Sequence, residues 1–337
     1  MRTIRPSLLA KQLRINARAD IPTMIWGPPG IGKSAIVYQL AESMNAKLFE
    51  LRANLFDPVD VRGGLKVVEQ QDGTYRTRYG VPEDYPDTNY TGPVVLLIDE
   101  LPNAPKATQN ALLQLILNKK IGTYELPQGA FIVAAGNRSI DRAAVHEMPT
   151  PVKTRFAHFE LESNIDDFCA WAMQNDIDPT IISFVRYRPT LQNSLDSREN
   201  AMPTSRGWEM TDRALKLVTN ASADEQFYAV ASIVGDGPAG EFIAFKQQAD
   251  KMPDLDRILA TPGSVEVPSD PAVLFAVSSA LASRADQNSF KNIMSYAKRM
   301  PAEYQVVLVR DSLAKDRELT QTPAFQQWTQ DNASVLM

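Results

Sequence analysis

The first half of the chain alternates between helical and strand-like hydrophobic patterns. Apolar positions at helical spacing predict helices over 5–19, 33–44 and 107–118. The run Val94–Ile98 is apolar at every position, which is typical of a parallel strand buried on both faces. Shorter runs predict further strands at 22–26, 47–51, 130–135 and 158–161. Strands that alternate with helices predict an α/β fold with a parallel sheet and helices on both faces.

Two segments interrupt this alternation. Residues 64–79 place Asp72-Gly73 between two arms of β-prone residues, which predicts a hairpin. Residues 119–130 predict a smaller hairpin or an extended loop. Both segments are therefore expected as insertions in the α/β part of the chain.

Strand signals stop near residue 164. The remaining sequence has helical periodicity, with Gly235–Pro238 as a plausible boundary inside it. The predicted organisation is an α/β core over 1–161, a helical part over 162–235 and a helical extension over 236–337. Helices are expected at 166–174, 179–186, 206–219, 224–234, 239–248, 270–283, 289–299 and 302–313.

Composition and charge exclude several classes of protein. The net charge of −5 does not suggest a general nucleic-acid binder. The chain has one cysteine, Cys169, and two histidines, His146 and His158, so neither an internal disulfide nor a Cys/His zinc cluster is expected. The N-terminal residues have no apolar core of signal-peptide length, and no apolar run is long enough to span a bilayer. We therefore expect a cytoplasmic protein.

A complete phosphate-binding motif, G-x-x-x-x-G-K-[ST], lies between the first predicted strand and the following helix. Glycines allow the backbone N–H groups to face phosphate oxygens, and the helix N-terminus adds partial positive charge. Lys33 is expected to contact the β- and γ-phosphates, and the Ser34 hydroxyl is expected to bind Mg²⁺. The residues of this motif are Gly27, Pro28, Pro29, Gly30, Ile31, Gly32, Lys33 and Ser34.

A pair of acidic residues, Asp99 and Glu100, directly follows the buried strand. The carboxyl end of a parallel strand faces the ligand-binding edge of an α/β sheet, so both carboxylates should lie beside the phosphate loop. Asp99 is expected to hold Mg²⁺ and Glu100 to polarise the attacking water. Such a pair favours hydrolysis of ATP over transfer to a small acceptor, and the sequence has no N-K-x-D motif for guanine.

On these residues, the chain resembles the AAA+ ATPases of the P-loop NTPase fold, and among them the MoxR-like group. The resemblance covers roughly residues 20–235 and includes L-L-I-D-E-L and Ala134–Asn137 in the family's order. It implies that Asn137 helps to orient the lytic water. It also implies that the residues over 162–235 form a helical lid.

The resemblance further implies two arginine roles. Arg155 corresponds to the arginine finger that reaches the ATP of a neighbouring subunit, with Arg138 and Arg142 as alternatives. Arg206, at the start of a lid helix, corresponds to a contact with the γ-phosphate. A finger that acts between subunits implies a ring, most simply a hexamer.

The hairpins and the C-terminal extension bear on the partner. The resemblance implies that such hairpins face the central pore or one face of a hexamer, with residues 56–63 leading into the first. Similar tails occur in relatives that act with von Willebrand A-type proteins, which suggests a docking role for the extension. Exposed cations that are candidates for contact with a client are Arg76, Arg78, Lys119 and Lys120.

Three hypotheses for the function follow. The first is a MoxR-like ATPase that acts as a chaperone or remodelling motor on a protein. The second is a nucleic-acid motor, either helicase-like or clamp-loader-like. The third is a binding module that uses nucleotide only as a switch, which the candidate hydrolytic residues disfavour. The acidic balance and the absence of a recognisable DNA-binding appendage disfavour the second.

Overall fold

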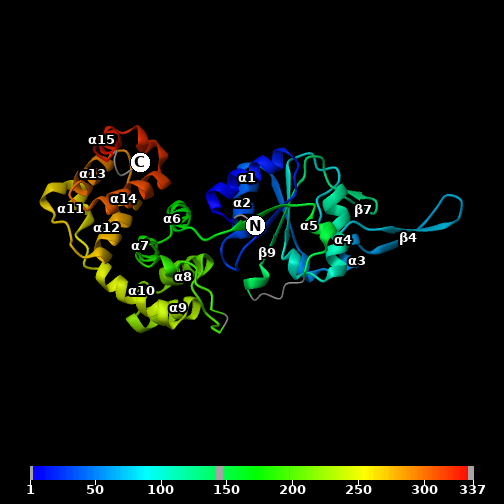
Figure 1. Ribbon diagram of the computed structural model, residues 1–337, viewed down its shortest axis with the longest axis horizontal. Helices are drawn as coiled ribbons and strands as arrows, with labels where there is room; N and C mark the ends of the chain where they lie inside the picture. The colour runs from blue at the N-terminus through cyan, green and yellow to red at the C-terminus, as the bar shows by residue number, and fades with distance from the viewer. Residues whose placement is uncertain (1–2, 142–146, 197, 333–337) are drawn as a thin grey trace. The chain divides into compact units, whose positions relative to one another are not determined.

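The computed structural model describes residues 3–141, 147–196 and 198–332, and it divides into two compact units, 1–163 and 164–337 (Figure 1). In the described residues, the first unit has a central six-stranded parallel sheet in the order β1-β10-β2-β9-β6-β3. This confirms the predicted fold class. Its strands are β1 (Thr3–Ile4), β2 (Thr23–Trp26), β3 (Lys47–Arg52), β6 (Val94–Asp99), β9 (Phe131–Gly136) and β10 (Ala157–Leu161).

Each strand of the sheet centre contributes to two separate cores. Along β6, Val95 and Leu97 face one layer, whereas Leu96 and Ile98 face the other, as the period of two requires. The first layer is covered by α1 (Pro6–Arg18) and α2 (Lys33–Ser43). Residues of α3 (Pro58–Arg62), α4 (Lys106–Asn118) and α5 (Thr150–Lys153) pack into the second layer. Helices therefore cover both faces (Figure 1).

Two antiparallel hairpins branch from this unit. Strands β4 (Leu65–Glu69) and β5 (Tyr75–Tyr79) pair around a turn in which Gly73 has a φ of +78°. The Asp72 carboxylate accepts a bond from the Thr74 amide at 3.0 Å, which stabilises the turn. The second hairpin pairs β7 (Lys120–Ile121) with β8 (Tyr124–Glu125). The β4–β5 hairpin extends far from the sheet (Figure 1).

The second unit is helical throughout its described residues. The hydrophobic pattern missed β1, α3, α5 and α11, because each has at most six residues and is too short to show a period; it also missed the nine-residue α15. No helix in the described ranges has the length and apolar character needed to cross a bilayer. The helices are α6 (Ile165–Gln174), α7 (Pro179–Tyr187), α8 (Ser205–Leu217), α9 (Ala223–Val234), α10 (Asp236–Ala249), α11 (Leu255–Ala260), α12 (Pro271–Ser283), α13 (Phe290–Ala297), α14 (Ala302–Lys315) and α15 (Pro323–Asp331).

Helix α12 joins two hydrophobic clusters of this unit. One cluster is formed mainly by α6–α10 and the other by α11–α15. Ala276 of α12 packs into the first cluster, and Val277 and Leu281 pack into the second. The first cluster continues across Gly235, since Val234 and Phe242 both belong to it. The division at residue 235 between a lid and an extension stays a prediction.

A buried ionic network also connects the early and late helices of the second unit. The Arg186 guanidinium on α7 donates to both carboxylate oxygens of Asp311 on α14, and at 3.0 Å to Asp166 on α6. Arg310 pairs with the same Asp166 carboxylate. The side chains of Arg186 and Asp311 are only 5% and 1% exposed. These ions are therefore removed from water and depend on one another.

Candidate nucleotide-binding site

The candidate site begins where β2 ends and α2 starts. Between these elements, Gly30 and Gly32 have φ values of +72° and +100°, a conformation that glycine adopts without steric cost. Gly32 is also the N-cap residue of α2, so the loop leads directly into the helix N-terminus. The Gly27 amide donates to the Gly136 carbonyl at 3.2 Å, which fixes the loop to the neighbouring strand β9. This geometry suits a loop that surrounds a phosphate.

Lys33 is held inside the loop. Its ammonium donates to the carbonyls of Gly27 at 2.9 Å and Pro28 at 3.0 Å, and to Asn137 Oδ1 at 2.8 Å. Lys33 is 8% exposed and Asn137 is 7% exposed. Hydrogen bonds to a charged group are among the stronger ones, so these contacts fix the position of the cation. The sequence placed Lys33 and Asn137 in different motifs, and the fold brings them into contact.

The acidic pair lies beside the first turn of α2. The Ser34 hydroxyl donates to Asp99 Oδ2 at 2.9 Å, so the two expected metal ligands are adjacent. The other Asp99 oxygen accepts a bond from the Glu100 amide at 2.9 Å. Hydroxyl and carboxylate oxygens are the donors that Mg²⁺ prefers, with water and phosphate completing its shell. The residues present therefore fit Mg²⁺.

Glu100 has an uncommon backbone conformation. Its φ of 55° and ψ of 29° lie in the left-handed region, a backbone conformation that costs energy for a residue with a Cβ. The conformation ends β6 and turns the chain into the 3₁₀ turn Leu101–Asn103. Such conformations occur preferentially at functional sites.

These residues meet because β2, β9 and β6 are neighbours in the sheet. All three strands run in parallel, so their carboxyl ends share one edge. That edge carries the phosphate loop after β2, Asn137 after β9 and Asp99 at the end of β6. A ligand site at this edge is the general rule for open α/β sheets.

Gly136 allows the edge to be closely packed. A Cβ at this position would lie 2.3 Å from the Cδ of Pro102, which follows the acidic pair. Real Cβ atoms do not approach other atoms so closely, so Gly136 is required by the packing of Pro102 against β9.

The three candidate arginines differ in their surroundings. Arg138 is bound within its own unit: it pairs with Asp141 at 2.6 Å and with Glu160 of β10 at 2.5 Å. Burial favours the neutral form of Asp141, but the bonds from Arg138 outweigh it, and the pKa of Asp141 is lowered. Arg155 is exposed and makes no ion pair with any described residue. Arg142 lies outside the described residues.

Arg206 is the second residue of α8 in the helical unit and is exposed. Thr204 is the N-cap residue of α8, and its hydroxyl accepts a bond from the Gly207 amide at 2.9 Å. This cap fixes the first turn of α8, which carries Arg206.

Sequence reasoning missed the partners of Arg138. Asp141 lies three residues after Arg138, a spacing at which an Asp side chain commonly bonds the backbone of a turn, so the sequence could have indicated this partner. Glu160 lies on β10, 22 residues after Arg138, and only the order of the strands brings it near.

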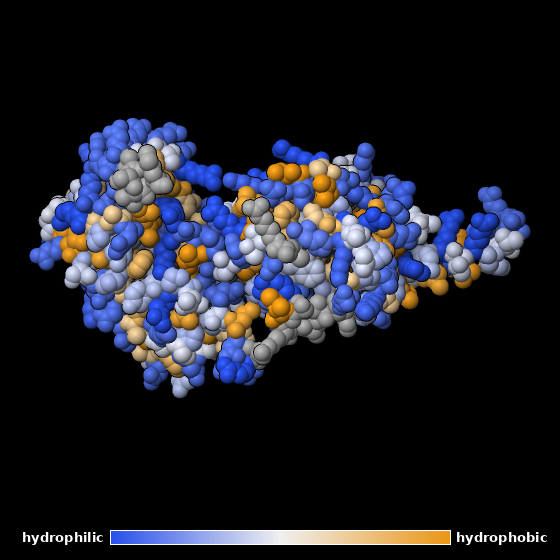
Figure 2. All heavy atoms as spheres, in the orientation of Figure 1, coloured by the Kyte–Doolittle hydropathy of each residue, from blue (hydrophilic) through white to orange (hydrophobic). Residues whose placement is uncertain are grey.

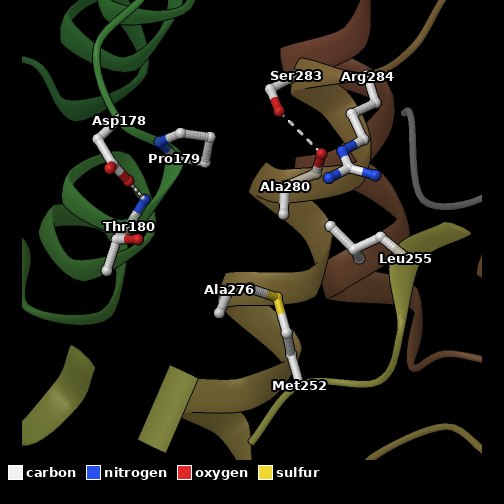
Figure 3. A pocket seen from close by; sticks show the side chains of 9 residues that line it. All are labelled: Asp178, Pro179, Thr180, Met252, Leu255, Ala276, Ala280, Ser283 and Arg284. Carbon is white, nitrogen blue, oxygen red and sulfur yellow. Dashed lines mark hydrogen bonds between the residues drawn. The ribbon is translucent and has the colours of Figure 1, made fainter. Parts of the chain in front are cut away.

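A separate cavity of about 300 Å³ lies in the helical unit, between α7, α11 and α12 (Figure 3). Its charged groups already have partners, since Asp178 caps α7 through the Thr180 amide and Arg284 pairs with Asp256. The rest of its lining is largely apolar and has no glycine loop. This cavity does not suit a nucleotide phosphate. Its lining residues are Asp178, Pro179, Thr180, Met252, Leu255, Ala276, Ala280, Ser283 and Arg284.

Comparison with known families gives a match to most of the first unit. A family model described as the MoxR domain in the MoxR-vWA-beta-propeller ternary systems matches residues 4–144. This part of the chain is therefore similar to a MoxR domain. The matched residues include the phosphate loop, the acidic pair and Asn137, whereas Arg155 and Arg206 lie beyond them. None of the curated proteins matches the sequence.

Three solved structures are distantly similar to this chain. A putative ATPase from Cytophaga hutchinsonii ATCC 33406 has 14% identity and a TM-score of 0.35, over 96% of this chain and 87% of that one. NtrX from Brucella abortus has 15% identity and a TM-score of 0.40, over 90% and 67%. The Thermotoga maritima RuvB Holliday junction branch migration motor has 17% identity and a TM-score of 0.39, over 82% and 81%.

Proposed function

We propose that this chain is a MoxR-like, Mg²⁺-dependent ATPase that hydrolyses ATP to ADP and phosphate in order to remodel a protein partner. The observation that carries the proposal is the contact network at one sheet edge. Lys33 bonds Asn137, and Ser34 bonds Asp99, within a domain that matches the MoxR family model. These are the side chains that phosphate binding, metal binding and water activation require.

Each of these groups has a distinct chemical task. Lys33 neutralises charge on the phosphates, and the loop amides bond their oxygens. Ser34 and Asp99 would hold Mg²⁺, which when bound neutralises charge on the β- and γ-phosphate oxygens. Glu100 accepts a proton from the attacking water, and Asn137 orients that water while it also fixes Lys33.

We assign the arginine finger to Arg155 and expect a ring, most simply a hexamer. The guanidinium of Arg138 is already paired with Asp141 and Glu160. Arg155 is exposed and lies just after α5, so it can reach a neighbouring subunit. A guanidinium from the neighbour stabilises charge on the γ-phosphoryl oxygens in the transition state. Arg206 is proposed to contact the γ-phosphate from the helical unit.

The partner is proposed to be a protein, in particular a von Willebrand A-type protein, as the description of the matching family suggests. The β4–β5 hairpin supports a client-contact role. Its register places Lys66 opposite Arg78 on one face, with Arg76 beside them, while Leu65, Val67 and Tyr75 lie on the other face and are exposed. Figure 2 shows both polar and apolar atoms on this projection.

The same hairpin disfavours the nucleic-acid alternative. Single-stranded nucleic acids are bound by cations together with aromatic rings on which bases stack. Here Tyr75 and Tyr79 lie on the face opposite to Arg76 and Arg78, because they alternate along β5. A nucleic-acid strand that lies on one face of this hairpin therefore meets either the cations or the rings. Filter binding to single- and double-stranded DNA at two salt concentrations tests this, and salt-sensitive binding would favour the nucleic-acid motor.

The proposed hydrolysis is tested with two variants and a mixture. Glu100→Gln should bind ATP and turn it over very slowly, because an amide cannot accept the proton. Arg155→Ala should also bind ATP but hydrolyse slowly, because the finger acts in the transition state. Arg14→Ala, which removes an exposed arginine of α1, is the matched control and should behave like the wild type.

The mixture tests whether the finger acts between subunits. Rings assembled from Glu100→Gln and Arg155→Ala subunits contain interfaces at which both groups are intact, so the mixture should exceed the average of its parts. Mass photometry with ATP and Mg²⁺ first establishes that mixed rings form. A mixed ring no more active than that average contradicts a finger in trans.

A further inference from the structure

The end of β2 and the segment that carries Arg155 are joined by one side chain, His158 of β10. The Trp26 indole N–H donates to His158 Nδ1 at 3.0 Å. His158 Nε2 lies 2.7 Å from the Lys153 carbonyl oxygen. Trp26 directly precedes the phosphate loop, and Lys153 is the last residue of α5, two residues before Arg155.

These contacts determine the form of the imidazole. The Trp26 indole is a donor only, so Nδ1 must accept and carries no proton. The Lys153 carbonyl is an acceptor only, so Nε2 must donate its proton to it. Both conditions are met by the neutral Nε2–H tautomer alone. The ring is also fixed by stacking on Trp26, with centroids 6.2 Å apart, and by an edge contact with Phe156 at 6.3 Å.

The bond to Lys153 restrains the segment that carries Arg155. Carbonyls at the end of a helix lack partners within the helix, and His158 supplies one to the last residue of α5. Arg155 lies between Val152, which is fully buried, and Phe156, which is 7% exposed. Its backbone is therefore anchored on both sides and at the helix end, while its guanidinium remains exposed.

We propose that His158 is a positioning residue for Arg155: it fixes the end of α5 against the strand that leads into the phosphate loop, and so sets where the finger is presented to the neighbouring subunit. This inference rests on the proposed role of Arg155. Displacement of a catalytic group by about 1 Å can lower a rate by about a hundredfold, so an anchor of this kind affects turnover strongly.

The test uses His158→Phe, which keeps an aromatic ring beside Trp26 and Phe156 but has neither hydrogen bond. Turnover should fall by about tenfold to a hundredfold, while affinity for a fluorescent ATP analogue stays unchanged. Retained nucleotide affinity also shows that the variant is folded. His158→Gln can place one acceptor and one donor and should recover part of the lost turnover. Wild-type turnover in His158→Phe would overturn the proposal.

A mixture shows through which group His158 acts. His158→Phe subunits are assembled with Glu100→Gln subunits, in parallel with the mixture of Arg155→Ala and Glu100→Gln. If His158 positions the finger, both mixtures contain intact interfaces and both exceed the average of their parts. If His158 instead shapes the phosphate loop of its own chain, ATP affinity falls and the His158 mixture shows no gain. This second result overturns the inference.

The parallel mixture separates the two levels of the argument. A gain with Arg155→Ala but none with His158→Phe refutes the positioning role and leaves the proposed finger intact. No gain in either mixture refutes the finger in trans, and the positioning role with it.

Discussion

The buried network of the helical unit predicts a large loss of stability when one charge is removed. Asp311→Asn preserves the shape of the side chain but leaves the Arg186 guanidinium with Asp166, whose side chain is 39% exposed, as its remaining carboxylate in this network. Because Arg186 is 5% exposed, water cannot replace the lost charge. Breaking a buried pair in this way typically costs about 3–5 kcal/mol. We expect a loss of this size in the free energy of unfolding of the helical unit.

The assay is urea unfolding of the full chain followed by tryptophan fluorescence. Trp26 is the one tryptophan before residue 164, so a Trp26→Phe background leaves Trp171, Trp208 and Trp328 as reporters of the helical unit. The midpoint should fall for Asp311→Asn while the slope stays constant, since the slope reflects the surface exposed on unfolding.

Two controls separate charge burial from loss of contact. Arg198→Gln breaks the exposed pair with Asp196, in which Arg198 is 84% exposed, and should leave the midpoint unchanged. The double variant Arg186→Met/Asp311→Leu removes both charges and should recover most of the stability, since apolar replacement of a buried pair is often neutral. A loss below about 1 kcal/mol for Asp311→Asn would show that Arg186 is solvated, and would refute the reasoning.

Four further outcomes are expected. Lys33→Ala should abolish binding of a fluorescent ATP analogue, because the phosphate charge is left uncompensated, and unchanged affinity would remove the phosphate-loop assignment. Gly136→Ala should lower the melting temperature, because its Cβ would overlap Pro102, and it should reduce turnover by moving Asn137; a variant identical to wild type would contradict the packing argument. Burial raises the pKa of Cys169 to about 12, so a thiol reagent should react with it only at the rate at which the helical unit opens, and rapid labelling of the native protein would contradict its burial. The pKa of Asp141 is lowered in the folded protein, so its contribution to stability is present above its unfolded pKa of about 3.9 and is lost as the pH falls. Arg138→Gln removes the bonds that lower this pKa, so the free energy of unfolding should then depend less steeply on pH in the acid range.

The sequence determined the secondary structure and the local chemistry. Helix and strand periods place α1, α2, α4 and the sheet strands other than β1 within one residue of their bounds in the structure, because each period reports which side chains face a core. The phosphate loop could also be predicted, since its glycines, lysine and serine lie within eight consecutive residues. The parallel sheet followed from the alternation itself. The periods, the motif and the alternation of elements all depend on residues close together in the sequence, so they can be recognised without the structure.

Contacts between distant residues were decided by the tertiary structure. Lys33 and Asn137 are 104 residues apart and meet because β2 and β9 pair. The engagement of Arg138 by Glu160 follows from the position of β10 beside β2. Arg186 and Asp311 are 125 residues apart, so nothing local in either segment indicated a buried ion pair.

The arrangement of the helices shows the same limit. Helix α12 is apolar on all sides, and its period therefore could not show that it serves two cores. The hydrogen bonds of His158 depend on the pairing of β10 with β2 and on the end of α5 at Lys153. Hydrophobic periodicity specifies which face of an element is buried, but the partner of that face is chosen by packing and strand order in the folded chain.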